Sequence, residues 1–252
     1  MKRFLIILSV ISVVISGCAQ QPVKQQSVAS QVPHVVTVPA FAKGAVDAVG
    51  GEQAWSTTEV IVGECTAKFY KPDGTFYLTR QRHAVYPWSD SIRIYAAEPQ
   101  GTFVWQLSGN NFTLLEGTPQ QAASLPMTLC DPAIARAIWS LMASPASLAT
   151  KSDPNRVFGA AVQVAGIWHR PLKLADSQLW YQNKESDILD ICQLEISGNT
   201  THLLARGYDY LPIEKTRIMA PTKIEIFTTN SSASELVRII ELDYRTLESV
   251  GF

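Results

Sequence analysis

Apolar and polar side chains alternate from Thr58 onward, which is typical of a strand that buries one face. The apolar positions are Ile61, Cys65, Ala67 and Phe69. The segment Lys71-Pro72-Asp73-Gly74 follows, and it favours a tight turn because proline presets one dihedral angle and glycine accepts a positive one. The chain then returns through Thr75–Val85, so we predict a hairpin.

Further short β-prone segments, separated by close turns, follow along the chain. They are Ser91–Ala97, Thr102–Leu107, Phe112–Glu116, Leu179–Gln182, Leu189–Ile196, His202–Tyr210, Thr222–Thr229 and Glu235–Tyr244. Val157–Val164 is an additional strand candidate, whereas Trp168-His169-Arg170-Pro171 is interpreted as a loop. Such a run of short strands predicts an antiparallel meander.

Helical spacing of apolar residues occurs in two places. Phe41, Ala45, Ala48 and Val49 share one face of a short predicted helix that ends at Gly50-Gly51, and a second turn carries Ala54 and Trp55. Asp131 followed by proline is typical of a helix start, and Ile134, Ile138 and Leu141 then recur at helical spacing. We therefore predict a second helix over Pro132–Ala143, which ends before Pro145.

The first seventeen residues are typical of a secretion signal. Lys2 and Arg3 precede an uncharged run from Phe4 to Ile15, which is shorter than the roughly 20 apolar residues that cross a bilayer as a helix. The stretch Val14-Ile15-Ser16-Gly17-Cys18 resembles the lipobox of bacterial lipoproteins, with Ile15 in place of the usual leucine. An ordinary signal or an uncleaved anchor that happens to contain a cysteine is the alternative.

The lipobox resemblance implies that diacylglycerol is attached to the thiol of Cys18 and that the chain is cleaved before it. Two or more acyl chains, such as palmitate, give stable membrane anchoring. In lipoproteins an aspartate after the cysteine often marks retention in the inner membrane, and Ala19 stands there instead. We therefore expect a protein anchored in the outer membrane and facing the periplasm.

The rest of the chain divides into a tether and one domain. Residues 18–40 contain Pro22, Pro33 and Pro39 and show no helical period, which predicts a flexible tether; an extra strand over Val35–Val38 is the alternative. Residues 41–252 have a length that suits a single domain. Of the 252 residues, 46% are hydrophobic, and removal of residues 1–17 leaves 19 basic against 22 acidic residues. A net charge of this sign gives no reason to expect a nucleic-acid partner.

Catalytic and metal-binding motifs are missing from the sequence. It contains no Gly-x-Ser-x-Gly, His-Glu-x-x-His, Cys-x-x-Cys or phosphate-binding glycine loop, so we expect neither an enzyme nor a cofactor. The scattered histidines are expected to be structural or at the surface; they are His34, His83, His169 and His202. Four carboxylates flank one predicted hairpin and are expected to lie in water; they are Glu185, Asp187, Asp190 and Glu195.

The cysteines allow at most one internal disulfide. If lipid occupies Cys18, the three remaining thiols belong to Cys65, Cys130 and Cys192, and three thiols cannot all pair among themselves. The alternative is three buried thiols that behave as small apolar side chains.

Apolar side chains on the predicted strands and helix form a candidate ligand-binding face. Alternation places Phe103, Trp105 and Leu107 on one face of a strand, and Phe112 and Leu114 on one face of the next. Ile134, Ile138 and Leu141 of the predicted helix would cover them. These eight residues either line a cavity for an acyl chain or fill a solid core, and the sequence does not separate the two.

The order of elements resembles that of the lipoprotein-carrier superfamily, which includes the periplasmic lipoprotein carrier and its lipid-anchored outer-membrane receptor. Three stretches carry the resemblance over residues 41–247: Ala48-Val49-Gly50-Gly51-Glu52-Gln53-Ala54-Trp55, Leu179-Trp180-Tyr181, and Ile224-Glu225-Ile226-Phe227 through to Leu242-Asp243-Tyr244. The resemblance implies a mainly β (α+β) fold, an antiparallel, partly open barrel or strongly curved sheet whose few helices cover a hydrophobic cavity. The arginine that holds the lid in that family has no assignable position here.

Two functions fit these observations. The first is a lipid-anchored, non-catalytic protein of the cell envelope that binds a lipoprotein or another hydrophobic ligand. The second is an envelope lipoprotein with a fully packed sheet that recruits a protein partner. A hydrolase with a nonstandard site fits less well, because no nucleophile motif is present.

Overall fold

The computed structural model describes residues 38–98, 101–118, 131–151, 157–174, 178–195, 201–230 and 236–251. The expected signal, Cys18, the tether as far as residue 37 and Cys130 lie outside these ranges. The described residues all belong to one compact unit, Val32–Phe252.

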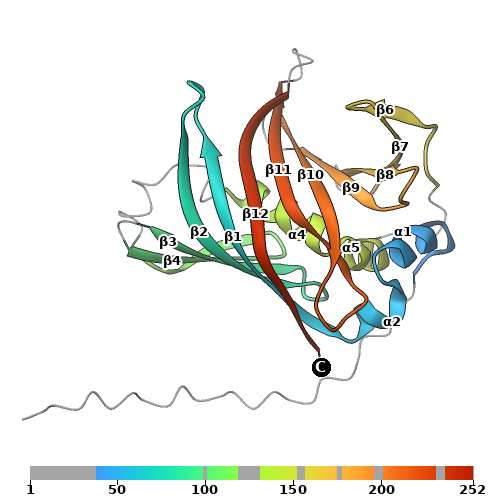
Figure 1. Ribbon diagram of the computed structural model, residues 1–252, viewed down its shortest axis with the longest axis horizontal. Helices are drawn as coiled ribbons and strands as arrows, with labels where there is room; N and C mark the ends of the chain where they lie inside the picture. Colours follow the sequence, from blue (N-terminus) through green and yellow to red (C-terminus); the bar gives the residue numbers. More distant parts are fainter. Residues whose placement is uncertain are drawn as a thin grey trace, which may run out of the picture. The chain divides into compact units, whose positions relative to one another are not determined.

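Twelve strands within the described ranges form one antiparallel sheet in the order β5-β4-β3-β2-β1-β12-β11-β10-β9-β8-β7-β6, and it is not closed (Figure 1). The strands are β1 (Thr58–Tyr70), β2 (Phe76–Tyr86), β3 (Ser91–Glu98), β4 (Gly101–Ser108), β5 (Asn111–Glu116), β6 (Val162–Val164), β7 (Ile167–Lys173), β8 (Gln178–Asn183), β9 (Leu189–Glu195), β10 (Thr201–Pro212), β11 (Met219–Asn230) and β12 (Leu236–Gly251). The predicted fold class and antiparallel meander are therefore confirmed. The pairing of β1 with β12 joins the two halves of the meander.

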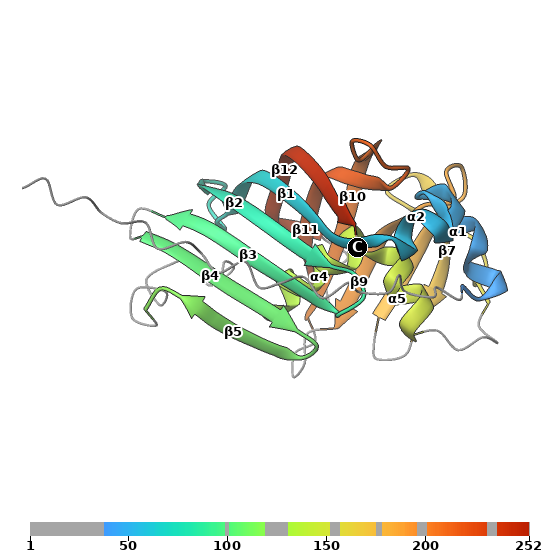
Figure 2. The ribbon, with the colours of Figure 1, turned by 90° about the horizontal axis from the view of Figure 1, so that it is seen from below.

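The topology explains why a helix crosses the sheet. The chain leaves the sheet at β5, on one edge, and returns at β6, on the opposite edge. Between these strands lie α4 (Pro132–Met142) and α5 (Ser144–Lys151). Helix α4 packs on β9–β11 from one half of the sheet and on β3 and β4 from the other (Figure 2). It therefore covers the inner face of the curved sheet.

The N-terminal helices follow the prediction. A 3-10 helix (Ala40–Ala42) leads into α1 (Lys43–Ala48), and α2 (Gly51–Ser56) comes directly before β1. Gly50 has φ 119°, and a Cβ at this position would lie 2.6 Å from the carbonyl oxygen of Arg217. Glycine is therefore needed here both for its backbone conformation and for the close approach of the loop between β10 and β11.

One expectation about residues 144–173 is wrong, and a second is confirmed only in part. Trp168–Pro171 is not a loop but lies within strand β7, which pairs with β8 along this stretch. Strand β6 pairs with β7 only as far as His169. Pro171 lies beyond the end of β6, so its missing N–H group removes no hydrogen bond between these strands. Helix α4 ends at Met142, before Pro145 as expected. A further helix, α5, begins at Ser144, so Pro145 lies in its first turn, where proline is tolerated because the first N–H groups have no helical partner. Of the strand candidate Val157–Val164, only Val162–Val164 is a strand.

Candidate functional site

The inner face of the sheet and helix α4 enclose the candidate site. Helix α4 starts as the sequence predicts: the side chain of Asp131 accepts a hydrogen bond from the backbone N–H of Ala133 at 2.8 Å. Its apolar side chains Ile134, Ile138 and Leu141 are at most 5% exposed. The helix therefore presents an apolar stripe to the sheet.

The structure brings the eight candidate residues into one hydrophobic cluster. Phe103, Trp105 and Leu107 lie on the inner face of β4 and are buried, and the rings of Phe103 and Trp105 stack with centroids 5.4 Å apart. Phe112 and Leu114 of β5 are partly buried against the same cluster.

A small cavity of about 10 Å³ lies directly beneath α4. Of the eight candidates only Ile134 and Ile138 line it, and the other lining residues are Phe69, Gln81, Ile94, Ile240 and Leu242. None of these five sheet residues was a candidate ligand-binding residue in the sequence analysis, because burial alone does not distinguish the lining of a cavity from an ordinary core strand. A cavity of this size holds about one water molecule. A larger ligand therefore requires α4 to move.

A buried polar cluster lies beside this cavity on the inner face. His83 is fully buried; its Nε2 lies 2.8 Å from Gln81 Oε1, and its Nδ1 lies 2.7 Å from the hydroxyl of Tyr244. Because an amide oxygen only accepts, Nε2 carries the proton and Nδ1 accepts from Tyr244. Burial lowers the pKa of His83 to about 3. The same burial raises the pKa of the neighbouring Cys65 thiol, whose sulfur lies 3.9 Å from Nε2.

Arg136 is the one charged residue of α4, and it ties the helix to the rim of the sheet. Its guanidinium forms an ion pair with Asp90, between β2 and β3, and donates a hydrogen bond to the carbonyl of Gly109, between β4 and β5. The guanidinium also lies over the ring of Trp139, 5.3 Å from its centroid. Sequence reasoning missed Arg136, although a lone charge within an otherwise apolar helix is a detectable signal.

The carboxylates near β8 and β9 differ in their exposure to solvent, although all four were expected to lie in water. Asp190 is 7% exposed and accepts hydrogen bonds from His169 Nε2 at 3.1 Å and from Asn183 at 3.3 Å, so the expectation that it lies in water is wrong. Burial raises the pKa of Asp190, and the nearby His169 opposes that shift. The hydrogen bond between His169 and Asp190 links β7 to β9.

Further features of the described part of the chain bear on the sequence analysis. Cys65 and Cys192 are buried, while Cys130 lies outside that part. No cluster of three or more potential metal ligands occurs among the residues described. No helix in the described ranges has the length and apolar character needed to cross a membrane. Trp55, Trp139 and Trp180 are core residues, but Trp168 is 52% exposed.

Comparison with known proteins identifies the architecture. A LolA superfamily protein from Nitrosomonas europaea superposes with a TM-score of 0.53 and 13% sequence identity, over 84% of this chain and 93% of that chain. This chain has the LolA-superfamily fold. A domain from Vibrio parahaemolyticus, described as outer membrane lipoprotein-sorting, is 9% identical with a TM-score of 0.42, over 75% of this chain and 85% of that chain. No family model matches the LolA-like chain, and no curated protein sequence matches it.

Proposed function

We propose that this protein is a non-catalytic, lipid-anchored component of the cell envelope that binds a lipoprotein or another acylated ligand between the sheet and α4. The observation that carries the proposal is the apolar interface beneath α4, with its small cavity and adjoining polar cluster. The LolA-superfamily fold supports it at the level of architecture, and the lipobox at Cys18 supports the anchor. Attachment to the outer membrane, facing the periplasm, remains part of the proposal.

The ligand would replace the contacts that α4 makes with the sheet. Exposing Ile134, Ile138 and Leu141 to water costs about 1.5–3 kcal/mol for each side chain, so the helix does not open freely. An acyl chain that slides into the same interface compensates this cost, because it covers the same apolar surface. Arg136 would then act as the contact that keeps the empty site closed.

The polar cluster gives the ligand a second point of attachment. Gln81 lines the cavity, and its amide oxygen is already paired with His83, which leaves its NH₂ group as a donor. An acyl ester or amide carbonyl entering beneath α4 would accept this hydrogen bond. The buried His83–Tyr244 pair holds Gln81 in place.

Ligand extraction and thermal unfolding test the proposal together. The protein purified from a bacterial envelope should release acyl lipid or lipopeptide into organic solvent, as detected by mass spectrometry. Addition of a lipidated peptide to the Val32–Phe252 unit at a hundredfold excess over its dissociation constant should raise stability by about 2.7 kcal/mol. The matched non-lipidated peptide is the control.

The second function, an interaction lipoprotein with a packed sheet, is favoured by the small size of the cavity. It predicts no lipid in the extract and no stabilisation by acyl ligands. It also predicts that Trp105→Ala, at a side chain 2% exposed, lowers stability by about 3–5 kcal/mol irrespective of ligand.

A further inference from the structure

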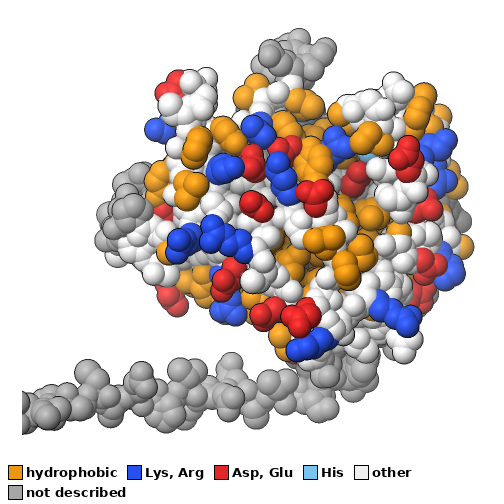
Figure 3. All heavy atoms as spheres, in the orientation of Figure 1, with side chains coloured by type: hydrophobic (Ala, Val, Ile, Leu, Met, Phe, Trp, Pro, Cys, Tyr) orange, Lys and Arg blue, Asp and Glu red, His pale blue; other side chains and the backbone are white. Residues whose placement is uncertain are grey.

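The outer face of the sheet, opposite α4, carries a basic groove formed by β1, β2, β3, β4 and β12. The groove has a volume of about 330 Å³, and Figure 3 shows basic side chains gathered over this part of the sheet. Its charged lining consists of Arg80, Arg82 and Arg245 against a single acid, Glu64. Strand alternation separates it from the inner face, because Arg80 and Arg82 flank the inward-facing Gln81.

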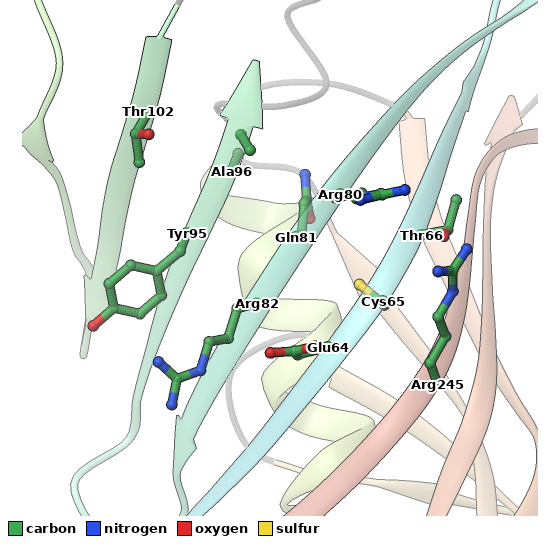
Figure 4. A pocket seen from close by; sticks show the side chains of 11 residues that line it. Glu64, Cys65, Thr66, Arg80, Gln81, Arg82, Tyr95, Ala96, Thr102 and Arg245 are labelled. Carbon is green, nitrogen blue, oxygen red and sulfur yellow. The ribbon is translucent and has the colours of Figure 1, made fainter.

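Two strands, β2 and β12, carry the three arginines: Figure 4 shows Arg80 and Arg245 on either side of Thr66, and Arg82 directed toward Tyr95. Arg80 and Arg82 lie two residues apart on β2 and so share one face. Arg245 comes from β12, where the register with β1 shifts between Glu64 and Cys65. A bulge of this kind redirects a side chain, and here it places Arg245 at the groove. Tyr95 forms a wall, with its ring 6.0 Å from the Arg82 guanidinium carbon.

These arginines differ from the other charges on the same face. On the neighbouring strands, Lys68 pairs with Glu241 at 2.8 Å and Arg238 pairs with Glu225 at 2.7 Å. Arg80, Arg82 and Arg245, by contrast, form no ion pair with any acid in the ranges the structure describes. Three like charges around one groove repel one another, and an anion between them would relieve that repulsion.

We propose that this groove binds the phosphate of an anionic phospholipid headgroup. Guanidinium groups suit phosphate because their planar N–H donors match its oxygens in pairs. The hydroxyls of Thr66 and Thr102 add neutral donors along the lining. The volume lies in the range of small-ligand sites, and none of the large apolar residues exposed on the described surface lines the groove, which disfavours a protein interface. The choice of a lipid over a soluble phosphate rests on the proposed anchor, which would hold the domain close to a bilayer.

The first test is protection of arginines in the full chain. An arginine-specific dicarbonyl reagent is applied in the presence of phosphatidylglycerol vesicles, phosphatidylcholine vesicles, inorganic phosphate or polyglutamate, and modified residues are mapped by mass spectrometry. Phosphatidylglycerol should slow modification of Arg80, Arg82 and Arg245 at least severalfold relative to phosphatidylcholine, while Arg170 and Arg217 are unaffected. Protection by inorganic phosphate or polyglutamate without protection by phosphatidylglycerol would overturn the headgroup assignment, as would no protection at all.

The second test compares charge-matched variants of the full chain. Each basic residue near an anionic surface contributes about fivefold to binding, so R80Q/R82Q/R245Q should lower the ratio of phosphatidylglycerol to phosphatidylcholine binding about a hundredfold. The control R170Q/K215Q/R217Q removes the same charge elsewhere, and an equal loss in the control would refute a specific site. Should the triple variant fail to fold, R82Q alone is expected to lower the ratio about fivefold. The ratio compares binding of the same protein to two kinds of vesicle, and insertion of the N-terminal segment contributes to both. The result therefore does not depend on lipid at Cys18 or on ligand binding beneath α4.

Discussion

Replacing Arg136 with glutamine tests whether α4 behaves as a closure over the candidate site. The substitution removes the ion pair with Asp90 and the hydrogen bond to Gly109 but leaves the apolar contacts of the helix in place. A hydrogen bond to a charged group contributes about 1.5–3 kcal/mol. The Arg136 side chain is 12% exposed and that of Asp90 is 32% exposed, so solvent screens part of the pair. We therefore expect the closed state to lose about 2 kcal/mol in total.

This loss has a distinctive effect if ligands bind only after α4 opens. The apparent dissociation constant is the intrinsic constant divided by the fraction of molecules that are binding-competent. A shift of 2 kcal/mol raises that fraction about 30-fold, so the affinity for an acyl ligand should rise by the same factor. At the same time the free energy of unfolding of the empty protein should fall by about 2 kcal/mol.

The assay is a titration with a fluorescent acyl probe, together with urea unfolding of the empty protein. Arg93→Gln is the matched control, because Arg93 lies on the outer face of β3, where it donates to Gln106 at 2.9 and 3.2 Å. It should leave probe affinity unchanged. If R136Q loses stability without gaining affinity, Arg136 is a structural contact only, and the idea of a closing helix is refuted.

Three further predictions concern the anchor, the thiols and pH. Cys18→Ser should abolish incorporation of radiolabelled palmitate in a bacterial host; continued labelling would contradict lipidation at this residue. Denatured, unreduced protein should show Cys65 and Cys192 as alkylatable thiols, whereas in the native protein burial and the raised pKa of Cys65 should block its reaction. Because the pKa of His83 falls from 6.5 to about 3 on folding, only the unfolded chain binds its proton between these values. The contribution of His83 to stability should be full above pH 6.5 and decrease by about 1.4 kcal/mol per pH unit as pH falls toward 3. His83→Gln should flatten this dependence in urea unfolding at pH 5 to 7, and an unchanged slope would show that another group causes it.

Local sequence patterns predicted most of the strands and the start of α4, because the interactions that form these elements involve residues close together in the sequence. Alternation along β1 reflects burial of one face, and the Asp131 cap depends on a contact with Ala133, two residues away. Local patterns failed where tertiary context overrode them. Proline usually disfavours a strand because it has no N–H group to donate, but Pro171 lies beyond the end of β6, where no partner strand accepts a hydrogen bond from it.

The site itself depends on contacts between residues distant in sequence. Tyr244 and His83 are 161 positions apart, and Arg136 reaches Asp90 across 46 positions. Nothing in either local segment specifies these partners, since they meet only when β12 pairs with β1 and the chain between β5 and β6 crosses the sheet. The sequence by itself determined which side chains are apolar and which face of each strand they occupy. Only the tertiary structure decided how tightly α4 fills the space above them, because that depends on the curvature of the whole sheet.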